Sequence, residues 1–564
     1  MRRSLSIGII QHDPVVGDSS GNTARIANEY DTLLEADPDI VVAPELSLVG
    51  YPPRDLLHRR GLLDSQEAAL ETLSEVTADG PPLVVGTALR TEHDTGPPVH
   101  NSAVLLRDGC RDATYHKRLL PTYDVFDEHR YFRPGTEPVV VDVDGVGVGL
   151  TICEDAWHNT VVTGTRRHEI NPLLETASAG ADLVLTLSAS PFSLDKPARR
   201  EQRFLAHAGS TDCPVVFANQ VGGNDELVFD GHSFVAANGS ILDRLAGFEA
   251  ETAVVEVPLS GAGSSSVPRF ESERTRQARN ALRLGISDYF AKTGFDEAVI
   301  GLSGGIDSSV AAALAADALG AEHVYGVSLP STVTSRQSIE DARAVATNLG
   351  ISFDVVPVGT AVETLCDALR EYAQPLTGVA LENVQARVRG DVLMGLANER
   401  GALVLTPDNK SEAAVGYCTL YGDTVGALAP LGDCYKGLVY DLADSFNHDP
   451  PADTQTNPVI PPAVVEKAPT AELSEGQTDA DDLPPYETLD PLLESYIEGC
   501  QDRTELRDQY ERPLVTETLG RVVGAEFKRR QTPPPLRITQ KALGRGWNYP
   551  VAAEYDHVSG ADRD

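Results

Sequence analysis

A glycine- and serine-rich segment, LSGGIDSS at Leu302–Ser309, has the composition of a loop that holds phosphate groups. It stands between an apolar run that predicts a strand, EAVIGL, and a run that predicts a helix, VAAALAADALG. Glycines let a backbone approach phosphate closely, and the N–H groups at a helix start attract anions. A carboxylate repels bare phosphate, so we expect Asp307 to bind Mg²⁺ against the phosphate oxygens. The candidate phosphate-binding residues are Ser303, Gly304, Gly305, Asp307, Ser308 and Ser309.

This loop differs from the phosphate loop of Walker-type ATPases, because the chain has no G-x-x-x-x-G-K-[ST] motif here. An ordinary glycine-rich turn between a strand and a helix is the alternative interpretation. The pattern SGGxDSS in a strand–helix context favours the phosphate site over that alternative.

Three segments in the first half of the chain carry residues for nucleophilic chemistry. Glu45 lies in APELSLVGYPPRD, Lys117 in YHKRLLPTYDVFDEHRYF and Cys153 in GLTICEDAW. An amidase needs a nucleophile, a base that deprotonates it and a cation for the developing oxyanion. Cys153, Glu45 and Lys117 supply these in that order, and we expect Lys117 to lower the pKa of the thiol. Taken singly, a core cysteine, a loop carboxylate and a surface lysine are the alternatives.

Alternating strands and helices must position both sets of residues. From Ser4 to about Val257, short apolar strands alternate with amphipathic helices, and the strands are continuous apolar runs typical of sheets buried on both faces. The segment LSGAGSSSVP, Leu259–Pro268, is small, polar and aperiodic, as in a linker. A second strand–helix repetition follows it and predicts a doubly wound parallel sheet. We therefore expect domains at 1–258 and 271–555, a linker at 259–270 and a tail at 556–564.

Acidic residues dominate the charge, with 84 Asp and Glu against 46 Lys and Arg and a formal net charge of −38. Nucleic acid and anionic membrane are poor partners for such a surface. Lysine occurs at only eight positions, and a carboxylate-rich surface with little lysine suits a saline cytoplasm. An acidic enzyme from a mesophile is the alternative. The eight lysines are Lys117, Lys196, Lys292, Lys410, Lys436, Lys467, Lys528 and Lys541.

Cysteine usage and hydropathy predict a cytoplasmic protein. The seven cysteines are scattered without a C-x-x-C pair, which argues against a disulfide scaffold or a zinc ribbon and fits a reducing compartment. The start of the chain has only a short apolar stretch and predicts a first strand rather than a signal peptide. No apolar run approaches 18 residues, so we expect no membrane span.

The first half resembles the nitrilase, or carbon–nitrogen hydrolase, superfamily in the three segments around Glu45, Lys117 and Cys153. The resemblance implies an αββα sandwich, a Glu-Lys-Cys triad and glutamine as the substrate. It also implies accessory and glutamine-binding residues, namely Glu128, Tyr51, Tyr123 and Ser190.

The second half resembles the N-type ATP pyrophosphatases, which share an adenine nucleotide alpha hydrolase-like fold, through its SGGxDSS loop. Three further segments are similar to the NAD⁺ synthetase family: LENVQARVRGDVLM, LTPDNKSEAAVGYCTLYGD and FKRRQTPPPLRIT. One departure is Pro407-Asp408, which stands where that family usually has Thr-Gly. The resemblance implies that Thr406 and Lys410 bind ATP and that Glu412 joins Asp307 on Mg²⁺. For deamido-NAD⁺ it implies Asn383, Arg387, Lys436 and Lys528.

The fusion of the two halves indicates a glutamine-dependent NAD⁺ synthetase, in which an amidase supplies ammonia to a ligase. The resemblance implies ATP, deamido-NAD⁺ and L-glutamine as substrates, Mg²⁺ as cofactor, and a homo-oligomer. Two alternatives stay open: another amidotransferase ligase on the same ATP-pyrophosphatase fold, and a catalytically dead nucleotide-binding regulator. The segments Leu381–Met394 and Phe527–Thr539 disfavour the first alternative. The second is disfavoured by an intact set of catalytic and metal-binding residues: Glu45, Lys117, Cys153, Asp307 and Glu412.

The acidic surface predicts that folding depends on salt. Self-repulsion among the carboxylates loosens the fold in dilute buffer, and counterions screen it. We expect the melting temperature to rise from dilute buffer to molar KCl, beyond the concentration where simple screening is nearly complete. Thermal unfolding across that range measures the effect, and a melting temperature independent of KCl would favour the mesophile interpretation.

Overall fold

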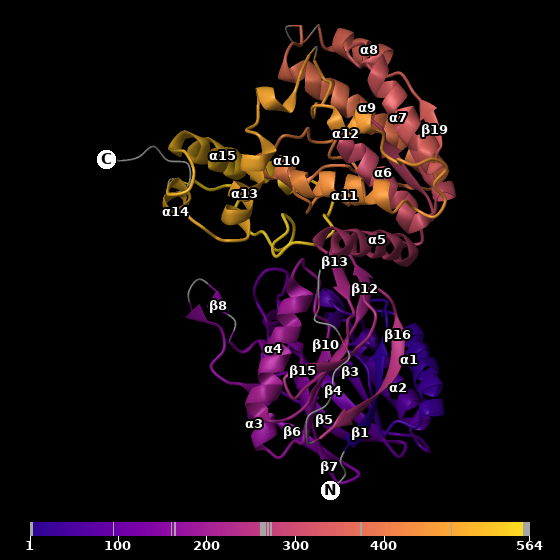
Figure 1. Ribbon diagram of the computed structural model, residues 1–564, viewed down its shortest axis with the longest axis vertical. Coiled ribbons are helices and arrows are strands. Elements are labelled where there is room, and N and C mark those ends of the chain that lie inside the picture. Colours follow the sequence, from indigo (N-terminus) through magenta and orange to yellow (C-terminus); the bar gives the residue numbers. More distant parts are fainter. Residues whose placement is uncertain are drawn as a thin grey trace. The chain divides into compact units, whose positions relative to one another are not determined.

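The computed structural model describes residues 4–555, apart from positions 94, 160, 163–164, 260–266, 268–269, 271–272, 371, 373–374 and 475. The chain packs as two compact units, Met1–Glu273 and Arg274–Asp564 (Figure 1). Most of the predicted linker, 259–270, and the whole predicted tail, 556–564, lie outside the described residues.

Two six-stranded sheets form the centre of the first unit. The first sheet has the spatial order β16 (Glu251–Pro258), β1 (Ser4–Gln11), β2 (Ile40–Val42), β3 (Leu83–Arg90), β4 (Val99–Arg107), β5 (Cys110–His116). The second has the order β15 (Ser240–Arg244), β14 (Phe234–Ala237), β11 (Val215–Asn219), β10 (Leu183–Ser188), β7 (Val146–Ile152), β6 (Val139–Val143). Two hairpins accompany them, β8 (Val161–Val162) with β9 (Thr165–Arg166) and β12 (Val221–Asn224) with β13 (Leu227–Asp230).

The two faces of each sheet explain why its strands are apolar throughout. Ile7 and Ile9 of β1 belong to a buried cluster that also contains Leu185 of β10, so the two sheets pack on each other. Ile10 belongs instead to a cluster with Ile26 of α1 (Ser19–Leu33). Helices α1 and α2 (Arg60–Val76) cover the first sheet, and α3 (Pro172–Ser178) and α4 (Lys196–Thr211) cover the second (Figure 1). The expected αββα sandwich is confirmed.

A four-stranded parallel sheet forms the centre of the second unit, in the order β19-β18-β17-β20. The strands are β17 (Ala298–Gly301), β18 (Val324–Ser328), β19 (Ser352–Val355) and β20 (Leu403–Leu405). The third strand in the chain pairs with the second, but the fourth returns to the other side of β17, so the strand order reverses between β17 and β20. Ligands bind at such a reversal, beyond the carboxyl ends of the strands.

Helices cover both faces of this sheet, which confirms the predicted doubly wound arrangement. Val299 of β17 packs with Val384 and Leu393 of α9 in a cluster that α8 also joins. Helix α6 packs against β17 and β18, and α5 and α11 pack on α6. The helices are α5 (Arg274–Thr293), α6 (Ile306–Leu319), α7 (Arg336–Leu349), α8 (Gly359–Leu369), α9 (Val379–Arg400), α10 (Lys410–Val415) and α11 (Lys436–His448).

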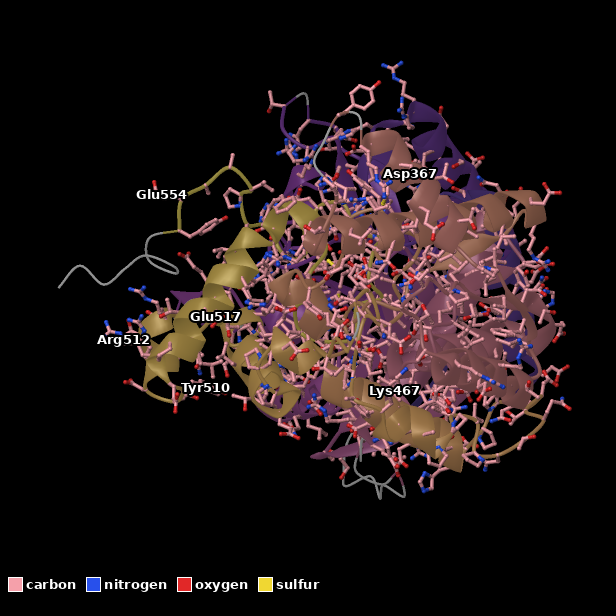
Figure 2. The ribbon with its side chains drawn as sticks, turned by 90° about the horizontal axis from the view of Figure 1, so that it is seen from above. Asp367, Lys467, Tyr510, Arg512, Glu517 and Glu554 are labelled. Carbon is pink, nitrogen blue, oxygen red and sulfur yellow. The ribbon has the colours of Figure 1, made fainter. Side chains whose placement is uncertain are left out.

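A helical layer follows the sheet in the chain. Buried side chains of α13, α14 and α15 form one cluster with Trp547. The helices of this region are α12 (Pro462–Glu466), α13 (Tyr486–Ile497), α14 (Arg503–Arg507), α15 (Arg512–Gly524) and α16 (Glu526–Arg529). Exposed carboxylates such as Asp367 and Glu517 lie on the outer faces of α8 and α15 (Figure 2).

Short 3₁₀ helices occur in both units: η1 (Leu34–Ala36), η2 (Arg54–His58), η3 (Glu128–Arg130), η4 (Cys153–Trp157), η5 (Ala321–His323) and η6 (Asp479–Asp481). Among the described residues, no helix combines the length and the apolar character that crossing a membrane requires.

A buried ion pair ties α4 to the end of β13. Both terminal nitrogens of Arg200 donate to the carboxylate of Asp230, at 3.1 and 2.6 Å, and both side chains are buried. Burial alone raises the pKa of Asp230, but Arg200 and His232 outweigh it and hold the pKa well below its usual range.

We expect Arg200→Ala to destabilise the first unit by about 3–5 kcal/mol, because it leaves an uncompensated buried charge. Arg90→Ala is the matched control, since the pair of Arg90 and Asp64 is exposed and contributes at most about 1 kcal/mol. Thermal and denaturant unfolding of the two variants measure the difference. Equal losses would mean that the Arg200 pair acts like a surface pair.

Candidate active sites

Carboxyl ends of strands carry the three predicted triad residues of the first unit. Glu45 lies three residues after β2, Lys117 directly after β5, and Cys153 directly after β7, where η4 begins. Cys153 has φ of 42°, in the left-handed region that side chains other than glycine rarely adopt. Backbone strain of this kind concentrates at functional sites, and here it belongs to the sharp turn between β7 and η4.

The Lys117 ammonium lies between two buried carboxylates. Its Nζ donates to Oε1 of Glu45 at 2.7 Å and to Oε1 of Glu128 at 2.9 Å. The two carboxylate side chains are 0% and 4% exposed and that of Lys117 is 1% exposed, so water does not screen the contacts. Tyr51 donates from its hydroxyl to Oε1 of Glu128 at 2.9 Å. The structure therefore brings Glu45, Tyr51, Lys117 and Glu128 into one hydrogen-bonded group.

Two further donors orient the Glu45 carboxylate. The side-chain amide of Asn101 donates to Oε1 at 2.7 Å, and the backbone N–H of Ala189 donates to Oε2 at 2.9 Å. Ser190 follows Ala189, is buried, and donates its own N–H to Asn219. Asn101 was not foreseen, because an asparagine inside an apolar strand carries no pattern of its own.

Electrostatics at Cys153 differ from the expectation of a lowered pKa. Burial raises the pKa of the thiol well above its ordinary value, and the charge of Glu45 raises it further. Lys117 lowers this pKa, but by less than the other two effects. The thiol is therefore protonated at rest and needs a base, which the neighbouring Glu45 carboxylate can supply.

A second carboxylate, Glu154, follows Cys153 and is also buried. It accepts a hydrogen bond from the Tyr123 hydroxyl at 2.9 Å and contacts Nε2 of His168 at 3.0 Å. The Arg167 guanidinium lies over the Tyr123 ring, 4.4 Å from its centroid. Only the adjacency of Glu154 to Cys153 could have drawn attention to it from the sequence.

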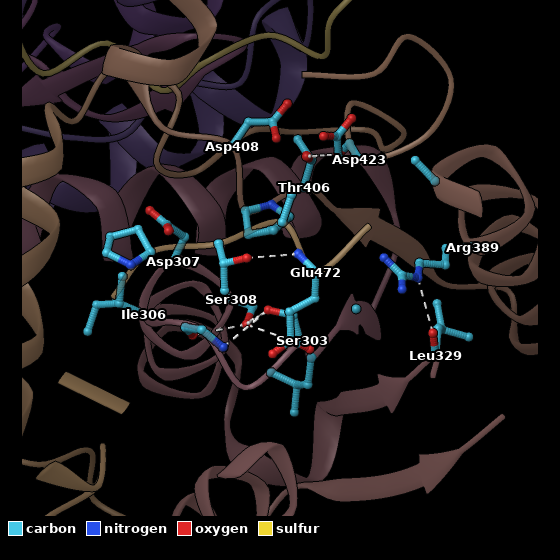
Figure 3. Close-up of a pocket in the computed structure, with 18 of the residues that line it drawn as sticks. Ser303, Ile306, Asp307, Ser308, Leu329, Arg389, Thr406, Asp408, Asp423 and Glu472 are labelled. Atoms are coloured by element: carbon cyan, nitrogen blue, oxygen red, sulfur yellow. Dashed lines mark hydrogen bonds between the residues drawn. The ribbon is translucent and has the colours of Figure 1, made fainter. Parts of the chain in front are cut away.

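The second unit holds a cavity of about 240 Å³ at the reversal point of its sheet (Figure 3). The loop after β17, the segment after β20 and the stretch 464–473 all line it. Seven of the predicted ligase residues lie on its wall: Ser303, Gly305, Asp307, Ser308, Thr406, Glu412 and Lys436.

Glycine is required at position 304 of this loop. Gly304 has φ of 79°, and a Cβ atom there would come within 2.2 Å of the carbonyl oxygen of Ser338 in α7. The Ser303 and Ser308 hydroxyls lie 3.0 Å apart, and Ser309, which is buried, donates to the carbonyl of Gly305. Hydrogen bonds of its own serines thus fix the loop.

Lys436 bridges the two predicted metal ligands. Its Nζ donates to Oδ2 of Asp307 at 2.6 Å and to Oε1 of Glu412 at 2.9 Å. Burial raises the pKa of Glu412 to about 7, with Lys436 lowering it and Asp307 raising it. Asp408, from the dipeptide that departs from the family pattern, also lines the cavity. Its pKa is raised well above the ordinary value by burial and then by Asp423, Glu412 and Asp307.

This crowding of carboxylates fits a divalent cation, since Mg²⁺ is commonly bound by one or two carboxylates together with substrate phosphates. Within the described ranges, no three His, Cys, Asp or Glu side chains converge closely enough to hold a metal. A cation beside Asp307 and Glu412 would take its remaining ligands from phosphate and water.

Thr406 lies on the cavity wall and donates from its hydroxyl to the carbonyl of Asp423 at 2.6 Å (Figure 3). The Pro407-Asp408 dipeptide that follows therefore does not remove Thr406 from the cavity. Two basic residues on this wall were not predicted. Arg389 of α9 donates to the carbonyl of Leu329, and Lys467 donates to the Ser338 hydroxyl at 2.7 Å. Two features of the sequence could have pointed to them. Arg389 lies two residues after the predicted Arg387, and Lys467 is one of only eight lysines.

Gly304 and Ser309 of the loop are not on the cavity wall, and four predicted residues from other segments are also absent from it. Lys410 is 0% exposed, and its Nζ contacts Asp433 at 2.8 Å and Glu498 at 3.0 Å. Lys528 donates to the carbonyls of Gly416 and Cys418, both at 2.7 Å. Asn383 accepts a hydrogen bond from Thr419, and Arg387 donates to the carbonyl of Leu420. Three of the four thus hold the segment that joins α10 to residue 423.

Geometry defines a class for each unit: a buried Cys-Glu-Lys amidase centre in the first, and a nucleotide-phosphate cavity of the SGGxDSS type in the second. The family model for carbon-nitrogen hydrolase matches residues 6–266, and that for NAD synthase matches residues 278–532.

Curated relatives are similar to this chain over nearly its whole length. A glutamine-dependent NAD(+) synthetase from Synechocystis sp. is 40% identical over 99% of this chain and 100% of its own length. Another from Aquifex aeolicus is 38% identical over 98% of this chain and 100% of its own length. The chain belongs to the glutamine-dependent NAD(+) synthetase family.

A solved structure agrees over the full length. The glutamine-dependent NAD⁺ synthetase from Acinetobacter baumannii, in complex with adenosine diphosphate, has a TM-score of 0.75 and 34% identity, with 100% of each chain covered. That from Cytophaga hutchinsonii has a TM-score of 0.81 and 20% identity over 98% of each chain, which supports the fold alone.

The raised pKa of Glu128 predicts a pH-dependent stability. Burial raises it from 4.5 to about 7, against the lowering effect of Lys117. The stability that this group contributes is therefore fully present below pH 4.5 and is lost as the pH rises through 7. We expect Glu128→Gln to remove this loss, worth about 3 kcal/mol at most.

Melting temperatures of the wild type and of Glu128→Gln at pH 5 and pH 7.5 test this. We expect the melting temperature of the variant to approach or exceed that of the wild type at the higher pH. Glu67→Gln, at a partly exposed pair with Arg111, is the control for a lost surface charge. A gap that stays constant with pH would contradict the assignment.

Proposed function

We propose that the chain amidates deamido-NAD⁺ to NAD⁺, using ATP and ammonia from L-glutamine, and releases AMP and pyrophosphate. One observation carries the proposal: a buried Cys153–Glu45–Lys117 centre and a cavity lined by the SGGxDSS loop occur in a single chain. Membership of the glutamine-dependent NAD(+) synthetase family supports the choice of substrates. The structure with bound adenosine diphosphate supports an adenine nucleotide in the ligase unit.

In the amidase unit, Glu45 takes the proton of the Cys153 thiol as sulfur attacks the carboxamide carbon of glutamine. The Lys117 ammonium, held by two carboxylates, stabilises the oxyanion that forms. Glu45 then returns the proton to the leaving nitrogen, the C–N bond breaks, and ammonia departs from a thioester on Cys153. Water cleaves the thioester to give glutamate, with Glu45 again moving the proton.

The proposed glutamine contacts of the amidase unit come from residues around the triad. Tyr51, Tyr123 and Ser190 are proposed to line the glutamine site, and Glu128 to hold Lys117 in place. Glu154 adds a buried carboxylate beside the nucleophile, suited to the α-ammonium group of the amino acid.

In the ligase unit, the Ser303–Ser309 loop holds the phosphates of ATP. The pyridine carboxylate attacks the α-phosphorus, the bond to the β-phosphate oxygen breaks, and pyrophosphate leaves. Ammonia then attacks the acyl carbon of the adenylate, giving NAD⁺, AMP and a proton. Asp307 and Glu412 would hold Mg²⁺, which supplies charge neutralisation at the phosphates. Lys436 and Lys467 on the cavity wall can contact phosphate oxygens.

Further assignments rest on the sequence and the family resemblance. Thr406 is proposed to contact ATP directly, whereas Lys410 and Lys528 act through the backbone they hold. Asn383 and Arg387 are proposed to face deamido-NAD⁺. We propose domain bounds of 1–258 and 271–555, a homo-oligomeric assembly and a cytoplasmic location, with neither nucleic acid nor membrane as a partner.

Two variants with opposite expected losses test the function. Cys153→Ala should abolish glutamine-dependent synthesis but keep synthesis from ammonium salts, because the ligase residues lie in the other unit. Asp307→Asn should lower NAD⁺ synthesis with either nitrogen donor by about 100-fold or more, since pyrophosphate release serves both routes. Steady-state assays of NAD⁺ and pyrophosphate with each donor measure both.

Glutamate release by Asp307→Asn, with glutamine alone, serves as the control for an intact amidase. Glutamine-dependent synthesis retained by Cys153→Ala would remove Cys153 from its role. A wild-type chain that binds ATP without releasing pyrophosphate would instead favour the nucleotide-binding regulator.

A further inference from the structure

Asn409 links the Asp307 carboxylate to the backbone of Glu412, and these are the two residues of the ligase cavity that are proposed to bind Mg²⁺. Its side chain is 0% exposed and both ends of its amide are used. The amide nitrogen donates to Oδ1 of Asp307 at 2.8 Å, and the amide oxygen accepts the backbone N–H of Glu412 at 3.0 Å. Residues 307 and 409 belong to different elements, α6 and the start of α10, so one amide joins two segments 102 positions apart.

A helix cap alone accounts for half of this arrangement. Asn409 has extended backbone (φ −104°, ψ 165°), and its side-chain oxygen accepts from the N–H of Glu412. This is the usual hydrogen bond of a helix N-cap residue. Capping requires only an acceptor oxygen. The donor end, directed to the Asp307 carboxylate, is not needed for the cap.

The amide nitrogen of Asn409 orients the Asp307 carboxylate. One carboxylate oxygen accepts from Asn409 and the other from Lys436, so the orientation of the group is fixed. The amide is neutral and leaves the negative charge of Asp307 in place for a cation. The same amide fixes the start of α10 and therefore the position from which Glu412 projects.

We propose that Asn409 is a positioning residue that sets the spacing and orientation of Asp307 and Glu412, and through them the affinity of the ligase cavity for a divalent cation. This inference rests on the proposed function of the cavity. Groups that orient metal-binding carboxylates typically affect metal affinity by about 10–100-fold when they are replaced.

Substitutions that keep the cap separate this role from capping. Asn409→Ser retains a capping oxygen but is too short to reach Asp307, and Asn409→Asp retains the cap while placing a carboxylate against Asp307. Asn171→Ser is the matched control, because Asn171 caps α3 in the first unit by accepting from the N–H of Leu174. Glutaminase activity and the melting temperature report on folding in all three variants.

The measurement is Mn²⁺ binding to the full chain in the presence of ATP and the absence of deamido-NAD⁺, by electron paramagnetic resonance. We expect about 10-fold weaker binding in Asn409→Ser, a larger loss in Asn409→Asp, and wild-type binding in Asn171→Ser. Wild-type affinity in both Asn409 variants would overturn the inference and leave Asn409 as a cap. Absence of Mn²⁺ binding in the wild-type chain would instead overturn the proposed metal role of Asp307 and Glu412.

If Asn409→Ser does not fold, Asn409→Asp carries the test, since aspartate is among the best capping residues. A folded Asn409→Asp with unchanged Mn²⁺ affinity would overturn the inference by itself.

Discussion

Buried ammonium groups, each placed between two carboxylates, organise both units of this chain. Lys117 contacts Glu45 and Glu128, and Lys436 contacts Asp307 and Glu412. A single charge away from water is costly, and a charge with excellent hydrogen-bonded partners is tolerated. The lysine in each group therefore fixes two carboxylates at once, and the chemistry proposed for each unit depends on that spacing. Of the eight lysines in the chain, Lys117, Lys410 and Lys436 are each buried between two carboxylates.

Both sites share a second constraint, since their polar groups stand where strands end. Glu45, Lys117 and Cys153 follow β2, β5 and β7, while Asp307 and Asp408 follow β17 and β20. A strand interior is closed by its neighbours and by the layers above and below it. Its carboxyl end is the nearest point at which a side chain meets both a rigid sheet and an open space. The expected αββα sandwich and doubly wound sheet thus fix the sites before any catalytic side chain is considered.

Strand patterns were sufficient to predict these layers, because continuous apolar runs bounded by glycine and polar turns leave few alternatives. The triad segments and the SGGxDSS loop could also be recognised, because their functional residues lie in short contiguous motifs. Asn101, Glu154 and Asn409 act through partners 56, 31 and 102 positions away, and no local pattern encodes such contacts. The sequence also states which residues are basic but not where they point. Lys410 matched a nucleotide-binding motif, yet its ammonium faces Asp433 and Glu498 inside the protein.

The surroundings of Lys410 bear on how the chain matures during synthesis. Its ammonium also contacts the Thr539 hydroxyl at 2.7 Å and the carbonyl of Lys541 at 2.9 Å, and Asp433 accepts the backbone N–H groups of Ile538 and Thr539. These partners lie 128 or more positions after Lys410 and are among the last described residues to leave a ribosome. Domains generally fold as units in order of synthesis. The amidase unit can therefore be complete while the ligase unit still lacks the segment 538–541, which completes the hydrogen bonds of the buried Lys410 ammonium and of Asp433.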